Sequence, residues 1–370
     1  MNILILNVGS SSIKYVVFKN KSEFLKGKIE RIGLKNPYLR ENNRITRINV
    51  RNFSDALNFI LKKLKDVKIN IIGHRIVHGG DIKKVSLVND KLLKKLKKVA
   101  ELAPLHDYPE LKVIESCKKL KVKQYAVFDT SFHQTLKEDA YTYALPYQLC
   151  KKYGIRRYGF HGESHNYMSK EASRILKRKN LKLITLHLGN GCSVCAINNG
   201  KSVDTSMGFT PLEGLVMGTR CGNIDPSIPF FLIKHEKIGL KEMGNILNKK
   251  SGLLGISGVS RNIKDLEKLK DKKSKLAIDV FVYNILKYIG AYYVVLNGLD
   301  ALVFAGGIGE NEHLIRKKVL DKLKFLKVKI DQNLNKENNL IISKKNSKVK
   351  VLIVKTNEEK IILNKILGVI

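Results

Sequence analysis

Two segments of this chain repeat one short pattern, in which two apolar runs are joined by a small polar turn. Residues 3–18 read as a strand, the turn NVGSSS and a second strand; residues 183–197 read as a strand, the turn GNGCS and a second strand. The dipeptide at 199–200, Asn-Gly, favours a tight hairpin and predicts a third strand after the second copy. Backbone amides in such tips can approach a phosphate closely, because no bulky side chain intervenes. The repeat therefore predicts two halves that each open with a phosphate-binding hairpin.

The rest of the chain alternates apolar runs of strand length with amphipathic stretches of helical period. Further strands are expected at 69–78, 122–128, 301–306 and 349–354. Helices are expected at 53–65, 89–100, 109–119, 165–178, 227–248 and 274–297, from about Asn311, and at the end of the chain. The glycine-rich turn after the strand at 301–306 is a third unit that can present backbone to a nucleotide.

The charge balance is strongly basic. Lys and Arg number 69 against 33 Asp and Glu, a net charge of +36, which is typical of proteins that bind polyanions. The excess consists of 56 Lys but only 13 Arg, and the lysines are spread over the polar sides of amphipathic patterns such as 91–102. Arginine supplies most bidentate phosphate and base contacts. We therefore interpret the excess as solvated lysine faces and expect no nucleic-acid partner.

Cysteines and targeting signals add little. The five Cys include one C-x-x-C, Cys192 and Cys195, in a strand-like stretch without two further soft ligands, so reduced and buried thiols are expected. The N-terminus has no basic region before its apolar run, and the apolar stretch 291–309 is interrupted by Asn297 and Asp300. We expect a cytoplasmic protein that contacts no membrane.

Eight stretches concentrate Arg, His, Asp and Asn beside glycine: GHRIVHGG, APLHDYP, VFDTSFHQ, YGFHGESH, HLGNG, DTSMGFTPLEGLVMGTRCGNIDP, AGGIGEN and KTNEE. Taken in order, they resemble the acetate kinase family, within the superfamily that also holds sugar kinases, heat-shock ATPases and actin. The resemblance runs from Asn7 to Glu359. It implies an α/β fold of two actin-like ATPase (ribonuclease H-like) domains with an active-site cleft between them. The first domain would span 1–130, joined by the last helix at about 360–370, and the second 131–359.

The activity implied is reversible, Mg²⁺-dependent, direct in-line transfer of a phosphoryl group from ATP to acetate, giving acetyl phosphate and ADP. An acceptor carboxylate is ionised near neutral pH, so this chemistry needs cationic groups rather than a general base. By resemblance, Asp129, His161 and Arg220 are catalytic, with Asp129 positioning Arg75 rather than abstracting a proton. Arg75 is expected to bind the acceptor carboxylate or the transferring phosphoryl group, and an apolar pocket of Val77, Leu105 and Pro211 is expected to line the methyl end of the acceptor.

The same resemblance assigns the nucleotide and metal sites. ATP is expected to contact Lys14, His187, Leu188, Gly189, Asn190, Gly191, Asn262, Ile263, Lys264, Gly307, Ile308, Gly309, Glu310 and Asn311. The metal, Mg²⁺ with Mn²⁺ as the alternative, is assigned to Asn7 and Glu358; Glu359 is adjacent, and the sequence leaves open which glutamate faces the metal. Asn262 and Lys264 stand where the family usually has Asp and Arg, which bears on nucleotide selectivity.

Three other functions compete with this interpretation. A kinase that prefers propionate or butyrate would carry the same motifs, since one methylene changes binding by only about 1–3 kcal/mol in such a pocket. A basic nucleic-acid-binding protein is favoured by the net charge alone. An actin-like structural ATPase would keep the phosphate hairpins but has no need for Arg75, His161 and Arg220 together.

The resemblance to the acetate kinase family also implies that the protein is a homodimer.

Overall fold

The computed structural model describes residues 1–9, 11–42, 44–102 and 104–370, with only the backbone described over 104–106. The chain divides into two compact units, the first formed by 1–134 with 357–370 and the second by 135–356. Each is built on its own sheet. The predicted class, a mixed α/β protein with two sheets, is confirmed.

The sheet of the first unit has eight strands in the order β5-β4-β3-β2-β1-β6-β8-β7. Strands β1 to β3 form an antiparallel meander, and β6 and β8 continue from β1 in parallel. The bounds are β1 (Asn2–Gly9), β2 (Ser12–Lys19), β3 (Ser22–Glu30), β4 (Tyr38–Glu41), β5 (Arg44–Arg47), β6 (Ile71–Ile76), β7 (Ser86–Leu87) and β8 (Lys123–Phe128).

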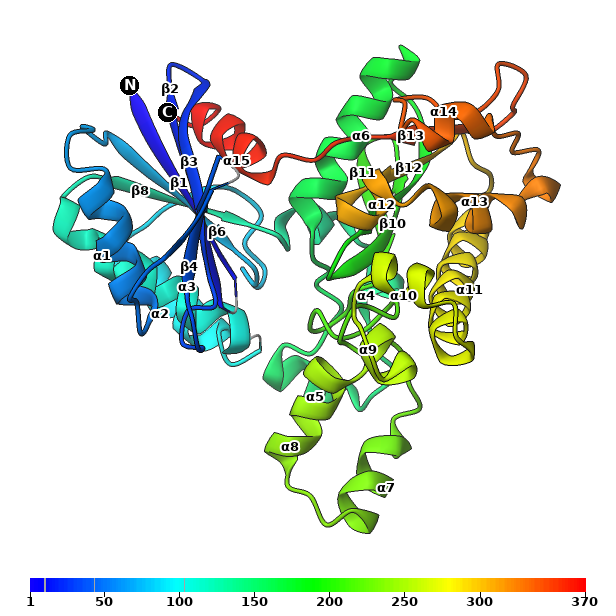
Figure 1. Ribbon diagram of the computed structural model, residues 1–370, viewed down its shortest axis with the longest axis horizontal. Coiled ribbons are helices and arrows are strands. Elements are labelled where there is room, and N and C mark those ends of the chain that lie inside the picture. Colours follow the sequence, from blue (N-terminus) through cyan, green and yellow to red (C-terminus); the bar gives the residue numbers. More distant parts are fainter. Residues whose placement is uncertain (10, 43, 103) are drawn as a thin grey trace. The chain divides into compact units, whose positions relative to one another are not determined.

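Strand β1 shows why this sheet is covered on both faces. Leu4 and Leu6 pack in one core cluster with α1 (Phe53–Lys63) and α3 (Pro104–Cys117), whereas Ile3 and Ile5 pack in another with α15 (Glu358–Leu367). Successive side chains of a strand point to opposite faces, so a continuous apolar run buries both. Figure 1 shows α15 on one side of this sheet and α1 and α3 on the other. Helix α2 (Asp90–Val99) packs beside α3.

The second unit repeats this topology with five strands in the order β11-β10-β9-β12-β13. Here β9 (Lys182–Leu188), β10 (Cys192–Asn198) and β11 (Lys201–Thr205) form the antiparallel meander, and β12 (Ala301–Ala305) and β13 (Lys350–Ile353) continue in parallel. Asn199 and Gly200 both have positive φ, as the predicted tight hairpin requires. The repeat read from the sequence is thus a repeat of topology.

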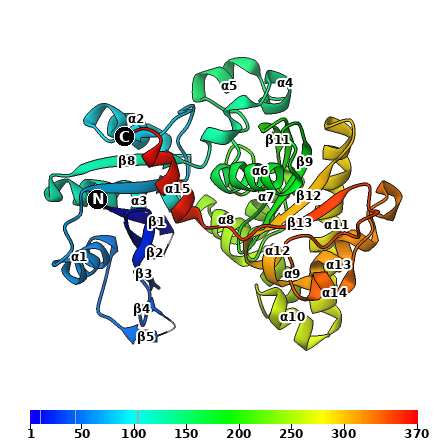
Figure 2. The same ribbon diagram turned by 90° about the horizontal axis from the view of Figure 1, so that it is seen from above.

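Helices α6 (Gly162–Leu176) and α11 (Lys272–Val295) pack against this sheet (Figure 2). The other elements of the unit are listed by their bounds: η2 (Ser131–Thr135, mostly in the first unit), α4 (Glu138–Tyr141), α5 (Tyr147–Tyr153), α7 (Ser227–His235), α8 (Leu240–Asn245), η3 (Ile246–Lys250), α9 (Gly252–Ser257), α10 (Ile263–Leu269), α12 (Gly306–Asn311), α13 (His313–Asp321), η4 (Lys324–Leu326) and α14 (Gln332–Lys336).

Three predicted helix boundaries are wrong. Helix α3 begins at Pro104 rather than at 109, because its first proline needs no amide donor in the opening turn and its second, Pro109, is tolerated inside the helix. The stretch 227–248 divides into α7, α8 and η3 rather than forming one helix. The glycine-rich segment before Asn311 is itself a helical turn, α12.

Helix α11 is long and apolar enough to cross a membrane by length and composition alone, although the sequence prediction finds no such segment. This is a weak indication, since core helices pass the same test. Phe281, Ile285 and Ile289 are among the residues that α11 buries within its unit. All five cysteines are free, and four of them are buried, as expected for reduced thiols.

Candidate functional site

In the first unit, polar side chains gather at the carboxyl ends of three neighbouring parallel strands. Asn7 lies near the end of β1, Arg75 near the end of β6, and Asp129 directly after β8. Leu6 pairs with His74, and Arg75 pairs with Val127, so the registers of β1, β6 and β8 bring these positions side by side. Ends of parallel strands are the usual place of ligand sites in α/β sheets.

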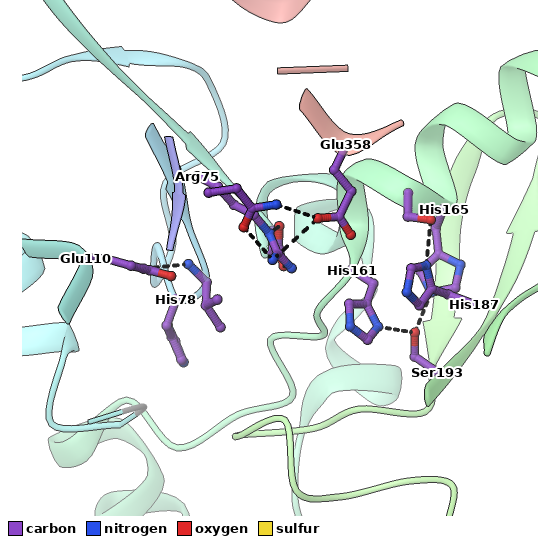
Figure 3. Close-up of polar contacts among 12 residues, drawn as sticks. Arg75, His78, Glu110, His161, His165, His187, Ser193 and Glu358 are labelled. Carbon is purple, nitrogen blue, oxygen red and sulfur yellow. Dashed lines mark hydrogen bonds and ion pairs between the residues drawn. The ribbon is translucent and has the colours of Figure 1, made fainter. Parts of the chain in front are cut away.

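Arg75 is held in this cluster by a fork of charge-assisted bonds. Its Nε and Nη2 donate to the two Asp129 carboxylate oxygens at 3.0 and 2.6 Å, and its Nη1 donates to Asn7 Oδ1 at 3.1 Å. A Glu358 oxygen lies 3.5 Å from the guanidinium, and Figure 3 draws this contact as a dashed line. Burial lowers the pKa of Arg75, but the Asp129 and Glu358 carboxylates more than offset it, so the pKa lies well above its ordinary value. The guanidinium is therefore permanently charged and fixed in direction.

The two glutamates at the start of α15 differ in environment. Glu359 is buried and pairs with Lys14 Nζ at 2.5 Å, whereas the Glu358 side chain is 24% exposed beside Arg75. Asn7 Nδ2 donates to both carboxylates, at 2.9 and 3.0 Å. Glu358 is thus the more accessible of the two oxygen-donor groups next to Asn7.

In the second unit, one face of a hairpin carries a chain of hydrogen-bonded imidazoles and hydroxyls. Ser193 pairs with His187 across β9 and β10, and Thr185 lies two positions before His187, so all three side chains share a face. Ser193 Oγ is 2.9 Å from His161 Nδ1 and 2.7 Å from His165 Nε2 (Figure 3). His165 Nδ1 is 2.7 Å from Thr185 Oγ1.

His161 sits at the position preceding α6, with φ of +54°, in the left-handed region that few non-glycine residues adopt. Its ring stacks on that of His187 with centroids 4.2 Å apart, and His187 Nδ1 is 2.8 Å from Ser164 Oγ. Residues in strained backbone conformations persist where the surroundings determine them, and they cluster at functional sites. Ring stacking and Ser193 together fix the His161 imidazole.

The turn between β9 and β10 lies directly beside His161 and Arg220. A methyl group at Gly191 would be 3.5 Å from both His161 Nε2 and Arg220 Nη1. Arg220 Nη1 also donates to the Pro211 carbonyl at 3.2 Å, and burial lowers the pKa of Arg220. An imidazole and a guanidinium therefore converge on a glycine whose backbone is open to a ligand.

A cavity of about 410 Å³ adjoins this turn. It is lined by Gly189, Asn190, Arg261, Asn262, Ile263, Lys264, Asp265, Gly307, Ile308 and Glu312. Asn262 Nδ2 donates to Asp265 Oδ2 at 3.1 Å, and Lys264 Nζ lies 3.7 Å from a Glu312 oxygen.

Gly306 allows α12 to approach β9 beside this cavity. Its φ is +77°, and a Cβ there would lie 2.6 Å from the Leu188 carbonyl oxygen. Glu310 Oε1 accepts from the amides of Gly306 and Thr356 and from the Thr356 hydroxyl, so this side chain ties α12 to the chain after β13.

The predicted residues thus fall into two groups, one in each unit. The first unit holds Asn7, Lys14, Arg75, Val77, Asp129 and Glu358. The second unit holds His161, His187, Leu188, Gly189, Asn190, Gly191, Pro211 and Arg220, together with the cavity residues and the turn 307–311. Leu105 lies in α3, and its side chain is outside the described part of the chain.

Sequence reasoning missed Ser193, Ser164 and Thr185. For Thr185 and Ser193 the signal is the alternation of the strands: once 183–188 and 192–197 pair as a hairpin, positions of one parity face α6. Ser164 lies on α6 itself, and no such pattern points to it.

Comparisons with known proteins agree with this arrangement. The sequence profile described as the Acetokinase family matches residues 2–364. The acetate kinases of Halothermothrix orenii and Thermotoga maritima are 45% and 48% identical to this chain, covering 98% and 97% of it and 98% and 96% of their own lengths.

Solved structures give the same picture. The Porphyromonas gingivalis acetate kinase matches with a TM-score of 0.91 at 38% identity, over 100% of this chain and 99% of that one. A propionate kinase from Francisella tularensis matches with a TM-score of 0.93 at 40% identity, over 98% of both chains. With fold, motifs and near-complete coverage in agreement, the chain belongs to the acetokinase family.

Proposed function

We propose that this protein is an acetate kinase, which reversibly transfers a phosphoryl group directly from ATP to acetate to give acetyl phosphate and ADP. The observation that carries the proposal is the convergence of His161 and Arg220 on Gly191. Phosphoryl transfer requires donors aimed at the transferring group's equatorial oxygens, and a charged guanidinium and an imidazole beside open backbone amides meet that need.

The acceptor side is assigned to the first unit. An acetate carboxylate would bind the Arg75 guanidinium, which Asp129 and Asn7 hold in a fixed direction. Asp129 acts as a positioning residue, because the ionised acceptor has no proton to give up. Val77, which is buried and follows Arg75 by two positions, would contact the methyl group together with Leu105. Pro211 is assigned to the acceptor by the family resemblance.

The nucleotide side is assigned to the second unit. The amides of Asn190 and Gly191 would hold phosphate oxygens, with His187 positioning them, while the Gly189 amide closes the turn by donating to the Gly191 carbonyl at 3.1 Å. The cavity along Asn262, Ile263, Lys264, Gly307 and Ile308 would take the nucleoside. This cavity would be shaped by the end of β9, with Leu188, and by α12, with Gly309, Glu310 and Asn311. Lys14 is assigned to a phosphate of the nucleotide. His161 and Arg220 would then donate to the transferring phosphoryl group.

We assign a Mg²⁺ ion to Glu358, whose carboxylate is partly exposed, and to Asn7, whose Oδ1 accepts from Arg75 and would exchange that bond for the ion. Among the described residues no group of three or more His, Cys, Asp or Glu is placed to hold a metal. Mg²⁺ suits so small a donor set, because it keeps several waters and uses substrate phosphates as ligands. When bound, it would supply charge neutralisation of the phosphates; Mn²⁺ takes the same ligands.

The hydroxylamine trap for acyl phosphates tests this function. Protein, Mg-ATP and hydroxylamine are incubated with acetate, propionate or butyrate, and the coloured hydroxamate is measured. Acetate should give the highest kcat/KM, Arg220→Ala should lose the signal, and Arg178→Ala, an exposed arginine paired with Asp300, should retain it. Folded protein that binds ATP but yields no hydroxamate would refute the proposal.

A propionate preference is the second candidate, favoured by the 40% identity and TM-score of 0.93 to the structure named a propionate kinase. The ranking of the three acids in the same assay decides between the two.

We also propose a cytoplasmic homodimer. Exposed aromatic and aliphatic side chains recur on three helices of the second unit: Tyr147, Leu149 and Tyr153 on α5, Phe230 and Phe231 on α7, and Tyr283, Val294 and Val295 on α11. Exposed apolar side chains of this kind would form a subunit interface where they lie side by side. Light scattering should give twice the chain mass, and Phe230→Asp with Phe231→Asp should give monomers. Phe325→Asp, at an equally exposed phenylalanine on η4, should leave the mass unchanged.

A further inference from the structure

Two carboxyl groups on α3 hold the backbone that follows Arg75. Asp107 Oδ1 accepts from the His78 amide at 3.1 Å, and Glu110 Oε2 accepts from the Val77 amide at 3.0 Å. Residues three apart on a helix share a face, so the two side chains reach successive amides of one segment. Figure 3 shows Glu110 and His78 near Arg75. The pair therefore fixes the segment 75–78.

The second oxygen of each carboxyl group is buried with no hydrogen-bond partner among the described residues, namely Asp107 Oδ2 and Glu110 Oε1. Both side chains are about as buried as a core leucine, at 1% exposure each. An ionised carboxylate oxygen without a donor is costly in such a place, whereas the neutral, protonated carboxyl group avoids that cost. Burial raises the pKa of Asp107 to about 8, and burial together with the Asp107 charge raises that of Glu110.

The charged and titratable groups around the pair come from the neighbouring elements. Arg75 lies on β6, His78 on the loop after it, and Asp129 after β8; the Asp129 charge opposes ionisation of both carboxyl groups, and Arg75 favours ionisation of Glu110. Two lysines of neighbouring elements pair with other carboxylates. Lys97 of α2 pairs with the exposed Glu115, and Lys118 of the turn η1 (Lys118–Leu120) pairs with the exposed Asp90. The His106 side chain is outside the described part.

The number of negative charges around Arg75 depends on whether Asp107 and Glu110 are protonated. Asp129 and Glu358 already place two carboxylates within 3.5 Å of this one guanidinium. Two further ionised carboxylates behind the segment 75–78 would make the surroundings more strongly negative, and an anionic acceptor would be repelled.

We propose that Asp107 and Glu110 are a proton-holding pair of positioning residues, which must keep at least one proton for Arg75 to take an anionic carboxylate acceptor. This inference rests on the proposed function and deepens it, because it makes acceptor binding, but not nucleotide binding, sensitive to pH.

The test compares wild type, Asp107→Asn, Glu110→Gln and the double variant by the hydroxamate assay from pH 6.5 to 9.5 at constant ionic strength. In the wild type, kcat/KM for acetate should fall about tenfold per pH unit once the pair loses its last proton, above the pKa of about 8 at which Asp107 ionises, while KM for Mg-ATP stays constant. Each single variant should displace the break, and the double variant should remove it. Glu115→Gln, an exposed glutamate of the same helix, should keep the wild-type profile.

A flat wild-type profile, a double variant that keeps the wild-type break, or a parallel rise in KM for Mg-ATP would overturn the proposal. Urea unfolding of the wild type and of Glu110→Gln across pH gives a readout independent of activity. Because the raised pKa lies in the folded state, the contribution of the pair to stability falls as pH rises from 5 to 8, so the wild type should lose stability relative to the variant over this range. Equal slopes would also overturn the proposal. Absence of hydroxamate at every pH would refute the proposed function alone, and the urea series would still decide whether the pair holds its proton.

Discussion

Ser193→Ala is the sharpest test of how the second unit prepares its imidazole. One hydroxyl lies within hydrogen-bond distance of both His161 and His165, at 2.9 and 2.7 Å. A hydroxyl can donate once and accept at its lone pairs, so it can serve both rings at once. Alanine removes both bonds and adds no atom that could clash.

The expected magnitude follows from these two bonds. Each contributes about 1 kcal/mol to stability, so the variant should lose about 2 kcal/mol of unfolding free energy. For a unit of this size, 135–356, that corresponds to a fall in Tm of about 4–8 °C. A His161 ring that is no longer held at Nδ1 should lower kcat by about 10–100-fold, because small misplacements of a reacting group cost that much. KM for Mg-ATP should change little.

Thr185→Val is the matched control. It removes the bond to His165 Nδ1 and leaves both Ser193 contacts in place. We expect a stability loss of about 1 kcal/mol and a kcat close to that of the wild type in the hydroxamate assay. If both variants lowered kcat equally, the Ser193 contact with His161 would have no special part in the chemistry, and the reasoning would fail.

Three further predictions concern other parts of the chain. Gly306→Ala should destabilise the protein by about 1–3 kcal/mol and raise KM for Mg-ATP, because the new methyl group meets the Leu188 carbonyl, whereas Gly290→Ala, in open space on α11, should be neutral or stabilising in thermal unfolding. His74 is buried and its pKa is lowered to about 4; below its unfolded value near 6.5 only the unfolded chain gains the proton, so stability should fall by about 2 kcal/mol from pH 7 to 5. In urea titrations, His74→Gln should lose this part of the decrease in stability between pH 7 and 5. A decrease as large as that of the wild type would contradict the prediction. Chelation of Mg²⁺ should abolish turnover without moving the urea midpoint, and Glu358→Gln should raise the Mg²⁺ concentration for half-maximal rate about tenfold, the loss of one charge-assisted contact of ~1.4 kcal/mol.

The sequence predicts strands well where an apolar run is covered on both faces. Ile3 to Leu6 offers no polar residue to either face, and the structure buries it between α15 and the pair α1 and α3. Prediction fails where local signals carry two meanings. Pro109 is typical of a helix start, yet α3 accepts it in its second turn because the helix already began at Pro104. Similarly, the glycines before Asn311 indicate a loop, but they form α12 because Gly306 alone needs positive φ.

The candidate site divides in the same way. Residues whose side-chain type indicates their chemistry, such as Arg75 and His161, can be proposed from motifs. Residues whose role depends on strand pairing cannot. Ser193 contacts His165 only because β9 and β10 pair in a register that turns its side chain toward that ring. Asp107 and Glu110 look like ordinary acidic residues of a helix until α3 is packed against β6 and their oxygens are found buried.

The two clusters also use different physics, and this difference predicts how each responds to its surroundings. Around Arg75 the contacts are ionic, so the number of protons held by nearby carboxyl groups sets the local charge. Around His161 the contacts run through the neutral hydroxyls of Ser193 and Thr185, which do not titrate in the physiological range. Salt and pH should therefore act mainly on acceptor binding through the first unit. Substitution of Ser193, the hydroxyl bonded to His161, should instead act on kcat, because it changes the direction of that imidazole without changing the charge around it.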